Sequence, residues 1–146
     1  MNNILKEFLA KQEEACRNPD TAYWFAKNED ADIEKCQEAA CKDTYYAYCF
    51  AGDIKGANTK KCQEVACKCS DTAFLFARDI KGTDIKKCQE AACKNSAYAF
   101  LFAKYIKEAN IEYCQKATYK NRYWAKRFAE EIPGADKKKY LIYSLL

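Results

Sequence analysis

The stretch that decides the fold is ACKCSDTAFLFARDIKGTDIKKCQEA (66–91), and a near copy, ACKNSAYAFLFAKYIKEANIEYCQKA (92–117), follows it directly. The same 26-residue unit continues on both sides, over 40–65 and 118–143, and over 15–39 with one residue missing. A unit repeated in tandem at this length predicts one supersecondary element stacked along a line, rather than a globule around a single site.

Each unit reads as two short helices. In the first, apolar residues recur at the spacing i, i+3, i+4, i+7, as in Ala73, Phe76, Ala77 and Ile80, which is typical of a helix with one buried face. The second starts after an Asp or Asn that can cap it by accepting from the first free amides. This capping position holds Asp32, Asn58, Asp84, Asn110 and Asp136. Between the two helices, Gly56, Gly82 and Gly134 are predicted to supply the left-handed residue at the helix C′ position.

These patterns predict an all-α fold. We expect a right-handed α-solenoid of about five 26-residue two-helix repeats, forming one helical-repeat domain over 1–146. Residues 1–14 are predicted to form an N-terminal capping helix with its apolar side turned inward. The residues of that side are Ile4, Leu5, Phe8 and Leu9.

The order A-x-x-F-A followed by G-x-D-I, as in Ala73–Ala77 and Gly82–Ile85, resembles the short two-helix repeats of α-solenoid proteins. The plan is similar to that of HEAT and TPR arrays, and the unit is nearest in length to the variant leucine-rich repeat of about 24 residues. The resemblance covers nearly the whole chain. It implies binding of a partner rather than catalysis, and a fold of this kind does not fix which partner.

Composition and charge narrow the function classes. Charged residues make up 32% and hydrophobic residues 49%, as in a globular protein, and no apolar run approaches the ~20 residues of a membrane span. The first residues lack the pattern of a secretory signal, so we expect a cytoplasmic protein without membrane contact. Residues 1–40 hold 5 basic and 9 acidic side chains, whereas 115–146 hold 8 and 3. This asymmetry could steer a charged partner or align copies head to tail, or simply keep the surface solvated.

The ten cysteines occur without a single histidine. Equivalent cysteines of adjacent units are predicted to lie about 8–10 Å apart, beyond the ~7 Å between Cα atoms that a disulfide tolerates. The C-x₄-C spacing on one helix points two thiols in different directions, so we predict no metal site and no cofactor. The thiols are interpreted as small buried hydrophobic groups. Cys49 and Cys69 fall outside the repeat pattern and are the two cysteines expected to be exposed or open to oxidation.

The sequence offers little for catalysis, since it has no histidine, no glycine-rich phosphate loop and no nucleophile elbow; we predict no catalytic residues and no enzyme activity. Binding is favoured instead, and aromatic and variable positions of the first helices are the candidates. The partner-binding candidates there are Tyr23, Trp24, Tyr46, Tyr48, Tyr98, Tyr123, Trp124 and Arg127. Tyr23, Trp24, Tyr123 and Trp124 are expected to be the most exposed. Packing between repeats is the alternative explanation of the whole set.

The C-terminal stretch YLIYSLL (140–146) is apolar to its last residue, which adds Leu145 and Leu146 as candidates for contact with a protein partner or a second copy in a homodimer. We therefore expect a non-enzymatic protein–protein interaction module. Nucleic acid is the competing partner, because lysines recur on the second helices and could follow a phosphate backbone, although solvation explains them equally. These lysines are Lys60, Lys61, Lys86, Lys87 and Lys137 to Lys139. A third alternative is an inhibitor from a mobile element or phage that acts on a host protein.

Overall fold

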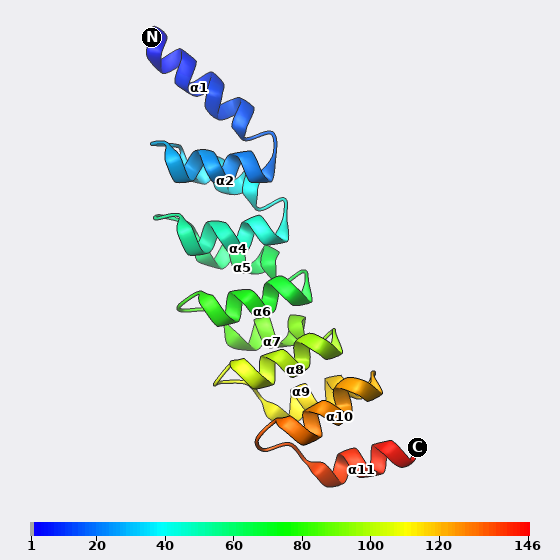
Figure 1. Cartoon of the computed structure of the whole chain (residues 1–146). Coiled ribbons are helices and arrows are strands. Elements are labelled where there is room, and N and C mark those ends of the chain that lie inside the picture. The colour runs from blue at the N-terminus through cyan, green and yellow to red at the C-terminus, as the bar shows by residue number, and fades with distance from the viewer. Residues whose placement is uncertain (1) are drawn as a thin grey trace. The chain divides into compact units, whose positions relative to one another are not determined.

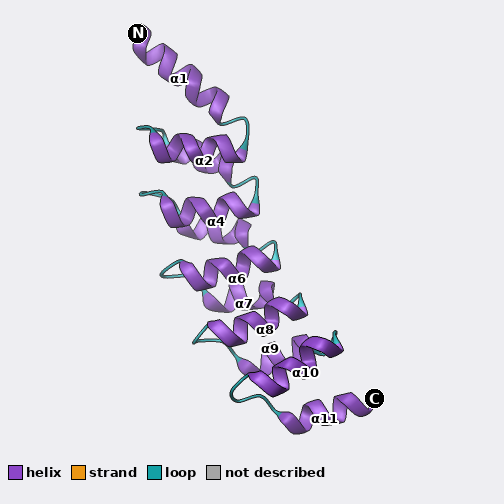
Figure 2. Cartoon of the chain, viewed as in Figure 1, coloured by secondary structure: helices purple, strands orange, loops and turns teal. Residues whose placement is uncertain are grey.

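The structure, a computed structural model, describes residues 2–146, and every regular element among them is an α-helix (Figures 1 and 2). The all-α class predicted from the sequence is confirmed. The helices are α1 (Asn3–Ala15), α2 (Pro19–Asn28), α3 (Ile33–Ala40), α4 (Thr44–Asp53), α5 (Thr59–Ala66), α6 (Ser70–Asp79), α7 (Ile85–Ala92), α8 (Ser96–Tyr105), α9 (Ile111–Thr118), α10 (Arg122–Glu131) and α11 (Lys137–Leu145). None of these helices is long and apolar enough to cross a membrane.

The chain divides into two compact units. The first ends at Ala66 and contains α1 to α5, and the second, Cys67–Leu146, contains α6 to α11. Within each unit an even-numbered helix packs against the odd-numbered helix that follows it, and consecutive even-numbered helices pack against each other. We call the even-numbered helices first helices, and the odd-numbered helices from α3 onward second helices. The helix–turn–helix unit predicted from the repeat is therefore present in both parts of the chain.

Capping residues start the helices where the sequence predicts. The side chains of Asp32, Asp84, Asn110 and Asp136 each accept a hydrogen bond from a backbone amide of the helix that follows. Asn58 does the same for Lys61, at 3.1 Å. Three first helices begin in the same way, at Asp43, Asn95 and Asn121. Each such bond satisfies a donor that the helix geometry leaves free, which fixes the boundary.

The glycines between the helices have a different role from the predicted one. Gly56, Gly82 and Gly134 do adopt positive φ angles, of 88°, 74° and 83°. The first helix, however, ends at an isoleucine in extended conformation, and the glycine lies two residues later. Ala57 donates to the carbonyl of Ile54 at 3.2 Å, which closes a β-turn with Gly56 at its third position. The glycine thus serves a turn that needs positive φ there, and not the C′ position of the helix.

The core of the last four repeats is the predicted one, whereas Phe25 of the first repeat is half-buried. The phenylalanine of the first helix is fully buried, at Phe50, Phe76, Phe102 and Phe128, and the alanine three residues before it is fully buried as well. The small alanine lets a neighbouring helix approach while the phenyl ring fills the space between them.

The capping helix α1 differs from the prediction. Ile4, Leu5 and Leu9 are exposed by 73%, 48% and 39%, so the expected inward-facing side is wrong for these residues. Only Phe8 packs inward, with its ring centroid 5.5 Å from that of Phe25. The physical reason is that α1 makes its main contact with one helix, α2, and a single neighbour covers only a narrow stripe. The residue of α1 that is buried is a polar one, Gln12.

In four places a buried glutamine joins an odd-numbered helix to the start of the next odd-numbered helix, a feature that the sequence interpretation missed. The side-chain oxygen of this glutamine accepts from the backbone amide of the capping residue one repeat later. These bonds are Gln12 with Asp32 (2.8 Å), Gln37 with Asn58 (2.8 Å), Gln89 with Asn110 (2.7 Å) and Gln115 with Asp136 (2.8 Å). A buried amide group without a partner is costly, so these bonds fix how one repeat sits on the next.

Candidate functional site

Aromatic rings gather on the two first helices of the first unit. We define cluster 1 as Tyr23 and Trp24 of α2 with Tyr45, Tyr46 and Tyr48 of α4. The ring centroids of its neighbours lie 5.0 to 6.1 Å apart, mostly in tilted or edge-on arrangements. Such arrangements place the positive edge of one ring against the negative face of the next. Four of the predicted partner-binding residues are thus brought into one patch, and Tyr45 belongs to it as well.

Tyr23 anchors cluster 1 and is not its exposed part. Its side chain is 5% exposed, so the predicted exposure of this residue is wrong. The cause is a polar clamp beneath the ring: Tyr23 donates its hydroxyl hydrogen to Asp53, and Lys27 donates to the Tyr23 hydroxyl at 2.9 Å and to Asp53 at 2.8 Å. The ammonium group also lies 5.3 Å from the ring centroids of Tyr23 and Trp24, within cation–π range.

The clamp changes the ionisation of its members. Hydrogen bonds from Lys27 and then Tyr23 hold the pKa of Asp53 below its usual value. Burial, followed by the hydrogen bond to Asp53, raises the pKa of Tyr23. The carboxylate and the ammonium group therefore stay charged over the whole physiological range, and the ring stays fixed beneath its neighbours.

The rings that cluster 1 offers to solvent are Trp24 and Tyr45, exposed by 53% and 52%. Tyr46 and Tyr48 are half-buried between them and the core. An exposed ring that a buried ring holds in place loses little conformational freedom on binding. Aromatic side chains that anchor protein interfaces have this property.

A pH titration checks the clamp. Because the pKa of Asp53 is lowered in the folded protein, its contribution to stability is present above the unfolded-state pKa of about 3.9 and is lost as the pH falls through the lower folded value. We expect the urea midpoint of Asp53→Asn to fall less between pH 7 and pH 3 than that of the wild type. The matched control Asp30→Asn, at an exposed loop position, should follow the wild type. An unchanged pH dependence in Asp53→Asn would contradict the clamp.

The second unit carries a corresponding group of rings. We define cluster 2 as Phe100 of α8 with Tyr123, Trp124 and Arg127 of α10. The centroid of Trp124 lies 5.4 Å from Phe100 and 4.9 Å from Tyr123. The Arg127 guanidinium lies 4.7 Å, 5.8 Å and 5.4 Å from the centroids of Phe100, Tyr123 and Trp124. Three of the predicted partner-binding residues therefore meet here, around one cation.

An acidic residue holds the cation of cluster 2 in place. Arg127 binds Glu131 through two nitrogens at 2.6 and 3.0 Å, and Lys104 reaches the same carboxylate at 3.1 Å. Arg127, and after it Lys104, hold the pKa of Glu131 below its usual value. The buried Phe100 (1% exposed) contacts the half-buried Trp124, and Trp124 in turn contacts the exposed Tyr123 (60% exposed). The expectation that Trp124 is among the most exposed residues is therefore wrong, because its ring packs on Phe100. Both clusters thus combine rings with a fixed cation and a fixed carboxylate.

The remaining predicted residues lie outside the two clusters. Tyr98 is half-buried on α8, where its ring packs on Phe74 with centroids 6.2 Å apart. Leu145 and Leu146 are 86% and 93% exposed. They share the end of α11 with Leu141 and Ile142, which are also exposed, and α11 has no fully buried residue. The apolar end that the sequence indicates is therefore uncovered in the structure.

The lysines that suggested nucleic acid are exposed, but they occupy other helices than the aromatic clusters. Lys60 and Lys61 lie on α5, Lys86 and Lys87 on α7, and 137–139 on α11, all of them second helices. Lys139 is engaged by Glu112 at 2.8 Å. The rings of the two clusters belong to first helices, so these lysines and these rings do not share a helix.

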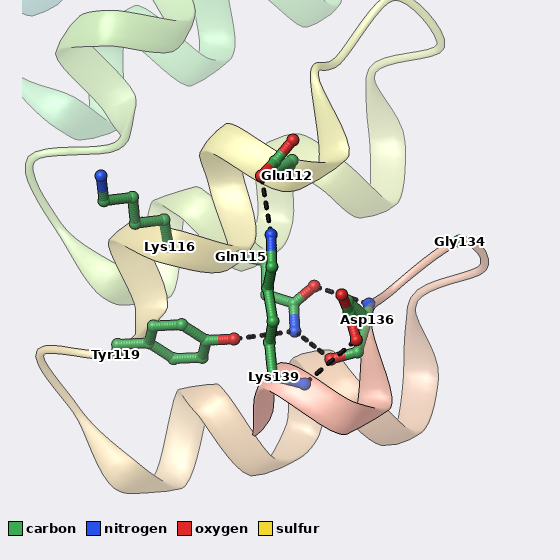
Figure 3. A pocket seen from close by; sticks show the side chains of 7 residues that line it. All are labelled: Glu112, Gln115, Lys116, Tyr119, Gly134, Asp136 and Lys139. Carbon is green, nitrogen blue, oxygen red and sulfur yellow. Dashed lines mark hydrogen bonds and ion pairs between the residues drawn. The ribbon is translucent and has the colours of Figure 1, made fainter. Parts of the chain in front are cut away.

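Hollows occur between consecutive second helices. The one between α9 and α11 measures about 500 Å³ and is shown in Figure 3. Gln115 lies at its base, where it donates to the carbonyl of Asp136 at 2.8 Å and to the hydroxyl of Tyr119 at 3.1 Å. Lys139 spans it to Glu112 (Figure 3). Similar hollows of about 600 and 280 Å³ lie between α3 and α5 and between α7 and α9. They recur with the repeat, and their polar groups bond to one another, so we assign them to the seams between repeats.

The cysteines form an arrangement that the sequence interpretation did not consider. Cys36, Cys62, Cys88 and Cys114 are fully buried, as predicted, and Cys69 is exposed while Cys49 is half-buried. Each of the four buried thiols lies against a cysteine from the preceding repeat. The sulfur–sulfur distances are 3.7 Å for Cys16 and Cys36, 3.8 Å for Cys41 and Cys62, 3.5 Å for Cys67 and Cys88, and 3.6 Å for Cys93 and Cys114.

The prediction of about 8–10 Å concerned equivalent cysteines of adjacent units, and these contacts join non-equivalent positions that it did not consider. The structure instead brings the cysteine that follows one odd-numbered helix next to the cysteine in the middle of the next. Among the described residues no three His, Cys, Asp or Glu side chains come close enough together to hold a metal ion.

A scan against protein-family models and searches of curated proteins and of solved structures returned no match. The contact geometry of the chain's own residues is thus what carries a functional assignment.

Proposed function

We propose that this chain is a non-enzymatic helical-repeat module that binds a protein partner through the aromatic surface of its first helices. The observation that carries the proposal is the exposure of Trp24, Tyr45 and Tyr123, each packed against a neighbouring ring that is buried or half-buried. Fixed aromatic side chains with a polar edge are the groups that contribute most to protein interfaces. The fixed Lys27–Asp53 and Arg127–Glu131 pairs would add charge complementarity at the rim.

The proposal includes the architecture predicted from the repeat. The 26-residue pattern runs without interruption through residues 66 and 67, where the two units meet in sequence. This continuity supports a right-handed α-solenoid of about five repeats. The exposed apolar end of α11, with Leu145 and Leu146, supports a second contact surface, for a partner or for another copy of the chain.

A protein partner is favoured over nucleic acid because of where the charges lie. Binding of a single strand combines aromatic stacking with a basic groove along the same path. Here the candidate stacking rings are on first helices and the lysines are on second helices, and carboxylates such as Asp53 and Glu131 stand beside the rings. Asp53 and Glu131 also occupy the cations nearest the rings, Lys27 and Arg127, which would otherwise be free to pair with a phosphate.

Substitution of Trp24 tests the proposal. The partner would be captured from the source cells with the wild-type chain, with and without nuclease, and its affinity then measured with purified components. We expect Trp24→Ala to weaken binding about tenfold, because an exposed anchor at the centre of an interface contributes more than about 1 kcal/mol. The folded state should be retained, since the ring is 53% exposed.

The matched control is Lys60→Glu together with Lys61→Glu on α5, which should leave the affinity within about twofold. Nucleic-acid binding predicts the reverse: capture that nuclease abolishes, a steep loss of affinity with salt, and a strong effect of the lysine changes. That outcome would replace the present proposal.

A further inference from the structure

The cysteine contacts follow a rule that the repeat alone does not require. We call Cys36, Cys62, Cys88 and Cys114 the inner thiols, in the middle of second helices, and Cys16, Cys41, Cys67 and Cys93 the outer thiols, directly after the odd-numbered helices that precede them. Each outer thiol is followed by its inner partner 20 or 21 residues later. Eight of the ten cysteines are used in this way.

In one repeat both cysteines of the pattern are replaced, and by the same residue type. One repeat after the Cys93–Cys114 contact, the outer position holds Tyr119 and the inner position, 21 residues on, holds Tyr140. Both members are replaced together, and no repeat keeps one cysteine and loses the other. Buried cysteines that served only as small apolar fillers could be replaced one at a time. Joint replacement indicates that the two positions act as a pair.

We propose that the four thiol pairs are sites of disulfide formation, which join each repeat to the next when the protein meets a small disulfide oxidant such as glutathione disulfide. The sulfurs already touch at 3.5 to 3.8 Å, so a bond of about 2.05 Å requires them to approach by roughly 1.6 Å. Side-chain rotation with a small backbone shift supplies this. Cys49 and Cys69 lie outside the pairs and take no part.

The chemistry is thiol–disulfide exchange in two steps. The outer thiolate attacks one sulfur of glutathione disulfide, the sulfur–sulfur bond of the oxidant breaks, and one glutathione thiolate leaves. The inner thiol then attacks the outer cysteine sulfur, the bond from that sulfur to glutathione breaks, and the departing glutathione thiolate takes up the proton of the inner thiol. For each bridge two cysteine thiols are oxidised and one glutathione disulfide is reduced to two glutathione thiols.

Accessibility sets the order of the steps. The outer thiols Cys16, Cys41 and Cys67 are half-buried, whereas the inner thiols are fully buried, so the oxidant reaches the outer sulfur first. Contact with Cys62 also holds the pKa of Cys41 below its ordinary value, which favours the thiolate there. At the fourth pair both sulfurs are buried, Cys93 being 5% exposed. The Cys93–Cys114 bridge is therefore expected to close last.

Peptide mapping of the full chain tests the proposal. The folded protein would be incubated with glutathione disulfide, alkylated, digested without reduction, and analysed by mass spectrometry at a series of times. We expect four bridges with the partners given above, closing last at Cys93–Cys114, and a midpoint of thermal unfolding raised by ~10 °C or more that returns to its original value after dithiothreitol. Eight thiols that stay free, or bridges that join other partners, would overturn the proposal.

Two variants test which cysteines pair. In Cys62→Ala the outer Cys41 has lost its resolving partner, so it should accumulate as a glutathione adduct while the other three bridges still form. The matched control, Cys49→Ser with Cys69→Ser, should form all four bridges at the wild-type rate. If Cys62→Ala fails to fold, the bridge map of the wild type and of the control still decides, since a map without the four pairs rejects the proposal on its own.

Discussion

Replacement of Phe102 by alanine is expected to lower the free energy of unfolding by about 3–5 kcal/mol, the largest effect of any single substitution considered for stability. Phe102 lies on α8 and has no exposed surface, and the residues three before it and four after it, Ala99 and Ile106, are buried on the same side of the helix. Truncation removes the apolar ring and leaves a cavity that rigid helix packing fills only in part. Urea unfolding followed by circular dichroism measures the change.

The control for this substitution lies on the same helix. Tyr105→Ala removes an aromatic ring that is 58% exposed, and we expect it to cost less than about 1 kcal/mol. If Phe102→Ala cost no more than Tyr105→Ala, the phenylalanine would not be the centre of the repeat core. The comparison separates burial from the general effect of losing a ring on α8.

The sequence was sufficient to predict the helices and where most of them begin, but not where the first helices end. Helix starts follow from a capping side chain that accepts from amides two or three residues on, a purely local interaction, as at Asp84. The buried face follows from periodicity, which put Ala73, Phe76 and Ala77 on one side of α6. The same capping and apolar pattern occurs in five copies of the unit, so a deviation in one copy does not change the prediction.

Contacts between repeats could not be predicted from capping residues and periodicity. The Cys41–Cys62 contact depends on how far one helix advances along the next, and spacing within a single unit does not contain that offset. The burial of Tyr23 likewise depends on Asp53, 30 residues later. The recurring glutamine could have been found, because four of the five second helices hold this polar residue at the same buried position, and a buried polar group needs a partner. Its partner, a backbone amide of the following repeat, leaves no trace in sequence.

The second large effect on stability is expected for the buried glutamines between repeats. Gln37 accepts from the backbone amide of Asn58 at 2.8 Å and donates to the carbonyl of the same residue at 3.3 Å, so it satisfies both polar groups where α5 begins. Gln37→Leu keeps the size of the side chain and removes both bonds. We expect a loss of about 1–3 kcal/mol in the free energy of unfolding, because a partly buried amide without a partner costs more than the bond itself contributes.

The neighbouring position supplies the control for Gln37. Glu38→Leu on the same helix also exchanges a polar side chain for leucine, but Glu38 is exposed and the change should stay within about 0.5 kcal/mol. Urea unfolding of both variants under the same conditions gives the comparison. If Gln37→Leu proved as mild as Glu38→Leu, water would have to serve the Asn58 backbone in its place, and the seam between repeats would depend on apolar packing alone. A clear difference would make the glutamine the polar group that sets the register of one repeat on the next.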